Sequence, residues 1–317
     1  MKKIICLLII STFILSGCVK EKAYEINFFA FDTLVELKIY QGGSQKILAE
    51  LKEEALRLEK LLNIHDEKSG ISQLEDKALI QGELSEVLQL SDEMKENTVG
   101  AFDPYLRRVS ALWAFGTPQE SIPARADIEQ LIVLKDEESV EDLDFGGIAK
   151  GYAANRLLAL AKDRGVKSAL FNLGGNIITL GDYQKGSFTI GLQDPLNDTG
   201  EILGVIQMKE NSAVTSGAYQ RGFTVDGLRY HHILDPSTGY PVQGDLLSVT
   251  LVLADSARAD AYSTALFVMG FDKAKDYATQ HALPVVLVRE DRAVLVLNAK
   301  DFKFELRNDN YHLIEER

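Results

Sequence analysis

The sequence predicts an α+β fold, with a single large domain over residues 25–317 in which helices flank a mixed, β-rich core. Helical periodicity prevails over residues 44–162, whereas short apolar segments typical of strands prevail over residues 168–253. Helices and strands thus fall largely in separate blocks, which is typical of α+β proteins and not of a doubly wound parallel sheet. No Pro-rich linker, low-complexity run or solenoid-length repeat interrupts the chain, so we expect one continuous core.

Residues 1–18 have the pattern of a lipoprotein signal. Two lysines precede an apolar run, residues 4–15, that is too short to span a bilayer stably, and small residues follow it directly before Cys18. The pattern predicts a signal peptide over residues 1–17 and a lipidated linker over residues 18–24. A lipid on Cys18 would hold the protein at the outer face of the cytoplasmic membrane. The alternative is an uncleaved anchor helix.

Charge and cysteine content exclude several classes of partner and site. The formal charge of −13 becomes −15 once the two lysines of the signal are removed, which argues against nucleic acid as a partner. Cys6 lies in the removed segment and Cys18 would carry the lipid. The mature domain therefore has no thiol for a disulfide, a zinc site or a nucleophile, and its chemistry must come from oxygen and nitrogen groups.

The first elements are a β segment and a long amphipathic helix. Residues 26–40 alternate around aromatic and β-branched side chains, which predicts a strand or a bent hairpin. Ser44 is a suitable N-cap for the helix that follows. Its apolar stripe, which we expect to pack in the core, is Ile47, Leu48, Leu51, Ala55, Leu58 and Leu62.

Three further helices complete the helical block. We expect shorter helices over residues 85–97 and 127–134, with the turn-rich stretch 100–104 between them. The next long helix should begin just after Gly146-Gly147 and run to Lys162, because the glycine pair precedes a helical pattern that Gly165 can cap.

The second half of the chain is rich in strands. Asp226-Gly227 is a strong hairpin turn, and Gly270 separates helices predicted over residues 256–269 and 272–280. Two final strands, around the Glu290-Asp291 turn, are expected to close the domain. The strands predicted by short apolar runs are 168–173, 177–180, 187–192, 202–208, 222–225, 230–234, 247–253, 285–289 and 293–297.

Two glycine pairs are candidate ligand contacts. Gly146-Gly147 leads into a helix with Lys150 in its first turn, where free N–H groups and the helix dipole favour an anion. It is not a P-loop, because the glycine spacing differs and Gly151 follows the lysine. A tight turn with a solvated lysine is an equally good interpretation. The second pair, in residues 172–176, permits either close backbone approach to a ligand or, more simply, a hairpin or bulge.

Asp260 and Thr264 are candidate metal ligands. They stand four residues apart in a predicted helix, so both side chains emerge on one face. A carboxylate and a hydroxyl are hard oxygen ligands that suit Mg²⁺. The alternative is that Thr264 bonds back within its helix and that Asp260 pairs with a nearby cation, Arg258 or Lys273.

A dense cluster of turn-forming residues and histidines occupies residues 231–241. Asp235-Pro236 and Thr238-Gly239 specify turns, and the two histidines precede them. His232 is a candidate general base or phosphate contact. We expect His231 on the opposite face of its strand.

In this order the motifs resemble those of the FAD:protein FMN transferase family, or ApbE family. The resemblance extends from about residue 31 to residue 270 and implies an ApbE-like fold related to the T-fold. It also implies that the chain binds FAD with Mg²⁺ at the pyrophosphate, transfers FMN to a threonine or serine hydroxyl of an acceptor flavoprotein, and releases AMP. The matching stretches are residues 100–103, 144–151, 172–176, 215–221, 232–241 and 259–265.

The resemblance implies a role for individual residues. The metal ligands would be the backbone carbonyl of Gly147 and the side chains of Asp260 and Thr264. His232 or Asp260 would take the proton of the attacking hydroxyl, and the sequence does not decide between them. Residues that the resemblance places against the flavin nucleotide are Phe31, His65, Ala101, Phe102, Asp103, Asp144, Lys150 and Ile233.

The chain departs from the family pattern at two of these positions. His65 stands where a tyrosine is usual, and Phe31-Asp32-Thr33 stands where Met-Gly-Thr is frequent. Two other functions share the same ligands: a Mg²⁺-dependent FAD pyrophosphatase, in which water attacks, and a flavin-binding lipoprotein without catalysis.

Overall fold

A computed structural model of the chain describes residues 23–137, 139–197 and 200–315. The predicted signal peptide, Cys18 and nearly all of the linker lie outside the described residues. Within those ranges no helix has both the length and the apolar character needed to cross a membrane.

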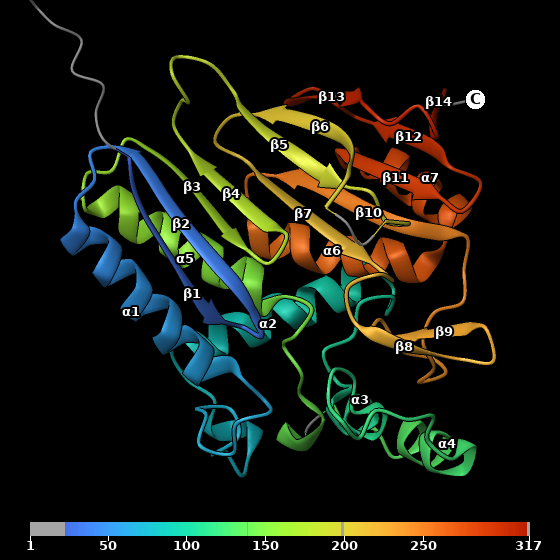
Figure 1. Cartoon of the computed structure of the whole chain (residues 1–317). Coiled ribbons are helices and arrows are strands. Elements are labelled where there is room, and N and C mark those ends of the chain that lie inside the picture. The colour runs from blue at the N-terminus through green and yellow to red at the C-terminus, as the bar shows by residue number, and fades with distance from the viewer. Residues whose placement is uncertain (1–22, 138, 198–199, 316–317) are drawn as a thin grey trace, which may run out of the picture.

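The centre of the molecule is a nine-stranded sheet (Figure 1). All of its described ladders are antiparallel except that between β12 and β14, which fits the α+β class predicted by the sequence. In spatial order its strands are β1 (Tyr24–Ala30), β2 (Thr33–Gln41), β3 (Ser168–Leu173), β4 (Asn176–Leu180), β7 (Ser212–Gly217), β10 (Leu246–Leu253), β11 (Val285–Arg289), β12 (Ala293–Leu297) and β14 (His312–Ile314).

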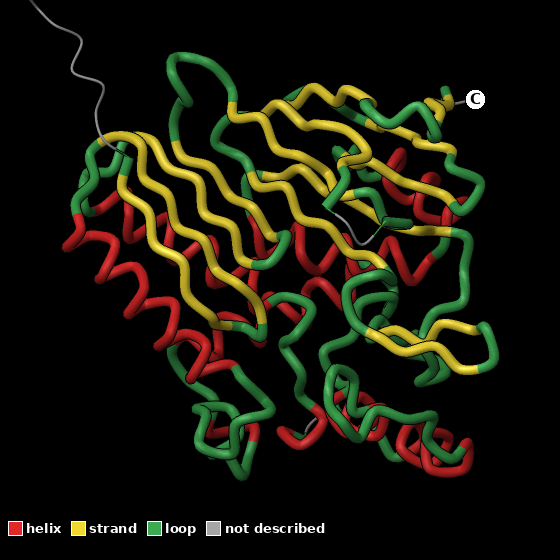
Figure 2. Tube along the Cα trace, in the orientation of Figure 1, coloured by secondary structure: helices red, strands yellow, loops and turns green. Residues whose placement is uncertain are grey.

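Helices cover one face of this sheet, and Figure 2 shows them gathered behind and below the strands. The apolar stripe of α1 is buried there as predicted, with Ser44 accepting a hydrogen bond from the N–H of Ile47. The helices are α1 (Gln45–Leu62), α2 (Glu83–Asn97), α3 (Arg107–Trp113), α4 (Arg125–Val133), α5 (Ala149–Asp163), α6 (Ser256–Met269) and α7 (Phe271–Gln280), with short 3-10 turns η1 (Lys77–Leu79) and η2 (Val140–Asp142).

A second, three-stranded sheet covers part of the other face. Its order is β13 (Phe302–Leu306), β6 (Ile202–Met208) and β5 (Phe188–Gln193). Its buried side chains pack against the outer face of β10, β11 and β12. The large sheet therefore divides the apolar interior of the single domain into clusters on its two faces, instead of the one continuous core expected.

A smaller aromatic cluster lies below the sheet, between α3, α4 and the hairpin of β8 (Gly222–Val225) and β9 (Leu228–His231) (Figure 1). The buried Trp113 donates its indole N–H to the carbonyl of Gly239 at 2.9 Å. This bond fixes the turn after the histidine pair against α3.

The structure corrects several expectations. The domain does not close at residue 297, because β13 and β14 follow. The strand predicted over residues 230–234 ends at His231, and Leu234 forms only an isolated bridge to Pro241. The sequence also missed α3, which has no side-chain cap. The apolar pattern gave no strand at β7, whose serines and threonine hide it, although the family resemblance implies a ligand-facing strand and turn over residues 215–221.

Two tight hairpin turns lie at neighbouring strand ends. Phe31 and Asp32 both have positive φ, 52° and 55°, in the two-residue loop between β1 and β2. Gly174 and Gly175 have φ of 65° and 89° in the loop between β3 and β4. A Cβ on Gly174 would lie 2.3 Å from the hydroxyl oxygen of Thr33, so the glycine is required where the two turns meet.

Candidate functional site

A cavity of about 940 Å³ opens at these turns, large enough for a dinucleotide. The β3–β4 turn, the start of α5, one face of α6 and the segment after β9 line it. The fold brings every candidate site residue of the described chain to this one cavity: Phe31, His65, Ala101, Phe102, Asp103, Asp144, Gly147, Lys150, His232, Ile233, Asp260 and Thr264. What each contacts in a ligand stays a prediction.

The start of α5 is joined to α6 by the carboxylate of Asp260. The N–H of Gly151 donates to Oδ2 of Asp260 at 2.9 Å. A regular helix would direct this N–H to the carbonyl of Gly147, and no described group donates to that carbonyl. The Asp260 carboxylate therefore supplies part of the negative charge expected at this helix N-terminus. Because it accepts the N–H of Gly151, the carbonyl oxygen of Gly147 stays available to a ligand.

Close packing of α5 on α6 makes this bond possible. A Cβ on Gly151 would lie 2.3 Å from the carbonyl oxygen of Ser256 and 2.6 Å from the Cα of Ala257. Only glycine permits the two helices to approach so closely. Gly151 therefore sets the distance between the first turn of α5 and Asp260.

Asp260 is 5% exposed, and its surroundings shift the pKa of its carboxyl in opposite directions. Burial raises the pKa of its carboxyl, while the charge of Lys150 and the hydrogen bond from Gly151 lower it. Asn176 lies beside it: its Oδ1 accepts from the hydroxyl of Ser256 at 2.7 Å, and its buried Nδ2 has no hydrogen-bond partner among the described residues that satisfies normal geometry. A buried carboxylate with one bonded oxygen is suited to a cation.

Thr264 fits both interpretations of its position, the hydrogen bond within its helix and the candidate metal ligand. Its hydroxyl donates back to the carbonyl of Asp260 at 3.2 Å, and it also lines the cavity. A Cβ built on Gly147 would lie 3.6 Å from this hydroxyl oxygen, so Gly147 and Thr264 are neighbours in the wall of the cavity that Asp260 also lines. One carboxylate, one hydroxyl and one free carbonyl are oxygen donors that fit Mg²⁺, which keeps several waters. No cluster of three or more His, Cys, Asp or Glu side chains suited to a metal occurs in the described ranges, and the predicted site does not need one.

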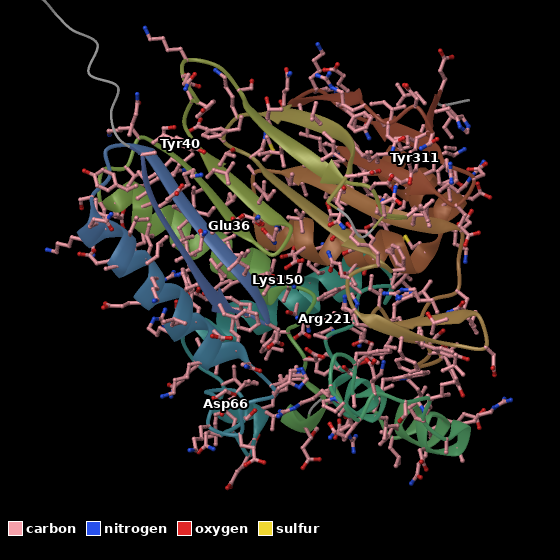
Figure 3. The ribbon with its side chains drawn as sticks, viewed as in Figure 1. Glu36, Tyr40, Asp66, Lys150, Arg221 and Tyr311 are labelled. Atoms are coloured by element: carbon pink, nitrogen blue, oxygen red, sulfur yellow. The ribbon has the colours of Figure 1, made fainter. Side chains whose placement is uncertain are left out.

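Two cations face this part of the cavity. Figure 3 labels Lys150, at the start of α5, and Arg221, which precedes β8; both lie near the lower ends of the strands of the large sheet. Arg221 also reaches across to the β1–β2 turn, where its Nη2 donates to the carbonyl of Asp32 at 3.3 Å. Positive groups on two walls favour a phosphorylated ligand between them.

His232 is close enough to both cations to be affected by their charges. Burial, then the charges of Lys150 and Arg221, lower the pKa of His232 to about 3. Its Nδ1 lies 3.4 Å from the carbonyl of Arg221, which can only accept, so Nδ1 carries the proton and Nε2 has the free lone pair. His231, by contrast, does not line the cavity; its Nε2 lies 2.8 Å from the carbonyl of Val242 and its ring meets Phe267 edge-on.

The low pKa of His232 should make folding depend on pH. Above about pH 6.5 the ring is neutral in both states, whereas between about 6.5 and 3 the unfolded chain takes up a proton that the folded chain does not. The free energy of unfolding should therefore fall as the pH falls through this window. The free energy of unfolding is measured in urea at pH 7 and at pH 5, for the unchanged chain and for His232→Gln. We expect its decrease between the two pH values to be smaller in His232→Gln, by on the order of 1–2 kcal/mol. Equal losses would show that the ring titrates normally.

The loop at residues 101–105 forms another wall. Asp103 is paired through Oδ2 with Lys135 at 2.6 Å and with Lys95 at 3.7 Å, and its side chain is 2% exposed. Its Oδ1 accepts from the N–H of Tyr105 at 2.9 Å. These bonds hold the loop in place and leave the carboxylate little capacity for the flavin contact predicted for it. Phe102 meets Gly147, where a Cβ would lie 3.0 Å from its ring.

Asp144, Phe31 and His65 differ in how firmly they are held. Asp144 Oδ1 accepts from the N–H of Gly146 at 2.7 Å, which shapes the turn into α5. The N–H of Phe31 donates to Glu59 at 2.8 Å, and this bond stabilises the positive φ of a bulky residue. His65 is exposed at the rim, where a ring can contact only the outer part of a ligand.

Sequence reasoning gave no individual role to Gly151, Asn176 or Arg221, although the resemblance implies that the stretch 215–221 faces the ligand as a strand and turn. All three stand in motifs that carry the family resemblance, so their position was marked. Their contacts were not, because each of the three bonds to a residue at least 80 positions away in the chain.

Comparisons with known proteins found relatives that match most of the chain. The model of the ApbE family matches residues 31–287. The FAD:protein FMN transferase of Klebsiella pneumoniae (strain 342) is 29% identical over 315 residues, covering 93% of this chain and 98% of the relative. The protein of the same name from Treponema pallidum is 29% identical over 295 residues, covering 81% and 82%.

Solved structures share the fold. The crystal structure of the ApbE protein of Thermotoga maritima is 30% identical and superposes with a TM-score of 0.77, over 86% of this chain and 96% of that one. The flavin transferase ApbE of Vibrio cholerae, at 20% identity, superposes with a TM-score of 0.74 over 90% and 97%, which supports the fold alone.

Proposed function

The chain belongs to the ApbE family, and from this premise we propose that it transfers FMN from FAD to a threonine or serine hydroxyl of an acceptor flavoprotein and releases AMP. The observation that carries the proposal is the arrangement around Asp260. A buried carboxylate, a hydroxyl and a free carbonyl face a cavity of dinucleotide size, with Lys150 beside them.

The donor set fits Mg²⁺. Asp260, Thr264 and the carbonyl of Gly147 would hold it. When bound, the ion offsets negative charge on the pyrophosphate and on the departing AMP. The hydrogen bond from the N–H of Gly151 would orient the carboxylate for this role.

The chain's own residues supply positioning and a proton acceptor. The acceptor hydroxyl forms a bond to the FMN phosphorus, the bond from that phosphorus to the oxygen of the AMP phosphate breaks, and the hydroxyl proton must leave. Of the two candidates, we assign the proton to Nε2 of His232, because its ring is neutral with a free lone pair, whereas Asp260 would be occupied as a ligand of the cation. The negative pyrophosphate between Lys150 and His232 would raise the pKa of that ring and so make it a better base.

We also propose that Cys18 carries a lipid and that the domain works at the outer face of the cytoplasmic membrane. The support is the signal pattern of residues 1–18. The acceptor would then be exposed on the same side.

Metal removal is the direct test of the reaction. With FAD, Mg²⁺ and a candidate acceptor flavoprotein domain, we expect mass spectrometry to show FMN covalently attached to the acceptor and chromatography to show AMP. Excess EDTA should abolish both products, and added Mg²⁺ should restore them. Transfer that continues unchanged in EDTA would contradict the metal site.

The same incubation without acceptor separates the other two functions. Accumulation of free FMN and AMP would identify a pyrophosphatase, in which water attacks in place of the hydroxyl. FAD that stays intact with and without acceptor, although it binds, would identify a flavin-binding protein without catalysis.

A further inference from the structure

We propose that β5 is the docking edge for the acceptor, which adds an extended segment beside this strand and so brings its hydroxyl into the cavity. The inference rests on the proposed function and names the recognition mode of its protein substrate. It comes from a part of the cavity wall that none of the predicted ligand contacts occupies.

Four consecutive residues of β5, Ile190 to Gln193, line the cavity. Side chains alternate along a strand, and here Ile190 and Leu192 are buried in the core while Gly191 and Gln193 are exposed. If the cavity bordered only one face of the strand, only every second residue would line it. The cavity therefore borders the edge of the strand, where its backbone N–H and C=O groups are.

This edge has no strand partner among the described residues. In the three-stranded sheet β5 pairs with β6 alone. In Figure 1 the side of β5 away from β6 faces β4, but β4 belongs to the large sheet, where it pairs with β3 and β7. Asn176 and Ile177 of β4 line the same cavity from the opposite side.

The side chains along β5 leave the edge open. The exposed row is Thr189, Gly191 and Gln193, with no charge, and the Cβ position of Gly191 is crowded only by the side chain of Ile202, at 3.1 Å. The opposite edge strand, β13, carries Lys303 and Glu305. Charged residues normally protect a sheet edge from pairing with another chain. In this sheet the edge at the cavity lacks that protection and the other edge has it.

Strand addition suits an enzyme that modifies a protein hydroxyl. Backbone hydrogen bonds to β5 would hold the segment with little demand on its sequence, and every second side chain would face the same way. A threonine or serine on the inward row would then point toward Asp260 and His232, which line the same cavity.

Backbone methylation of a short acceptor tests the pairing. The full chain is incubated with FAD, Mg²⁺ and synthetic peptides of about ten residues, the upper length of an ordinary strand, with one central threonine and randomised flanks. A peptide that receives FMN is then resynthesised with a single N-methyl group at each position in turn. We expect a period of two: methylation at alternate residues should lower kcat/KM roughly tenfold, because each removes one backbone hydrogen bond, and methylation at the intervening residues should change it little.

Site-specific cross-linking locates the peptide. A benzophenone side chain at Gln193 should attach to the bound peptide within a few residues of its threonine. The same group at Lys303, on the opposite edge of the same sheet, is the matched control and should not attach. Both positions are exposed, so folding should tolerate both.

The outcomes separate this inference from the proposed function. Uniform sensitivity to methylation, or cross-linking from Lys303 and not from Gln193, would overturn docking at β5 while transfer itself stands. FMN transfer to a folded acceptor domain but to none of the peptides would do the same, since strand addition needs only a short extended segment. If neither acceptor receives FMN, the proposed function fails and this inference fails with it.

Discussion

Asp260→Asn should lower kcat/KM for FMN transfer by roughly 10³-fold or more, because it removes the only charged donor of the predicted Mg²⁺ site. The amide keeps the size of the carboxylate, and its oxygen can still accept the hydrogen bond from Gly151. The apo protein should therefore fold, and thermal unfolding should show a melting temperature close to that of the unchanged chain. Titration with Mg²⁺ in the presence of FAD should show a large increase in the concentration needed for activity.

Asp272→Asn is the matched control, since Asp272 is an exposed carboxylate in the first turn of the next helix. It should leave both activity and Mg²⁺ dependence unchanged. Full turnover in Asp260→Asn would exclude the metal site. A collapse of stability in that variant would instead show that the carboxylate acts mainly as the N-terminal partner of α5.

Gly151→Ala should destabilise the fold, although the usual effect of this change inside a helix has the opposite sign. Alanine is favoured over glycine in helices by about 1 kcal/mol. Here the added methyl group would meet the backbone of α6 at 2.3–2.7 Å, and overpacking of this kind costs about 1–3 kcal/mol or more. We expect a lower free energy of unfolding in urea, and a loss of activity larger than the loss of stability explains, because α5 and Asp260 are pushed apart.

Gly244→Ala provides the comparison, because its Cβ would have only an ordinary contact of 3.7 Å with Val242. Its stability and activity should match those of the unchanged chain. A Gly151→Ala variant as stable as the Gly244→Ala variant would mean that α5 and α6 do not pack as closely as described.

Much of the local structure could be predicted from the sequence, because it depends on neighbours along the chain. The helix after Ser44, the helix after Gly146-Gly147 and the hairpin at Asp226-Gly227 each have their period, cap or turn residues within a few positions. Elements whose apolar pattern is weak locally were missed by periodicity, and β7, which only the family resemblance marked in part as a strand, is the clearest case. Its serines are buried and bonded to other elements, as in the contact of Ser216 with Ser263 at 2.8 Å, so hydrophobicity alone could not mark it as a strand.

The same division applies to the site. The sequence by itself determined which residues to expect in one place: the motifs placed Asp260, Thr264, Lys150 and His232 in one family pattern, and the fold brings them to one cavity. Only the tertiary structure decided what each can do. The Gly147 carbonyl is free because a carboxylate more than a hundred residues away takes the N–H of Gly151, and His232 is neutral because burial and the charges of Lys150 and Arg221 lower its pKa. Such properties depend on contacts and solvent exclusion between remote segments, and these exist only once the chain has folded.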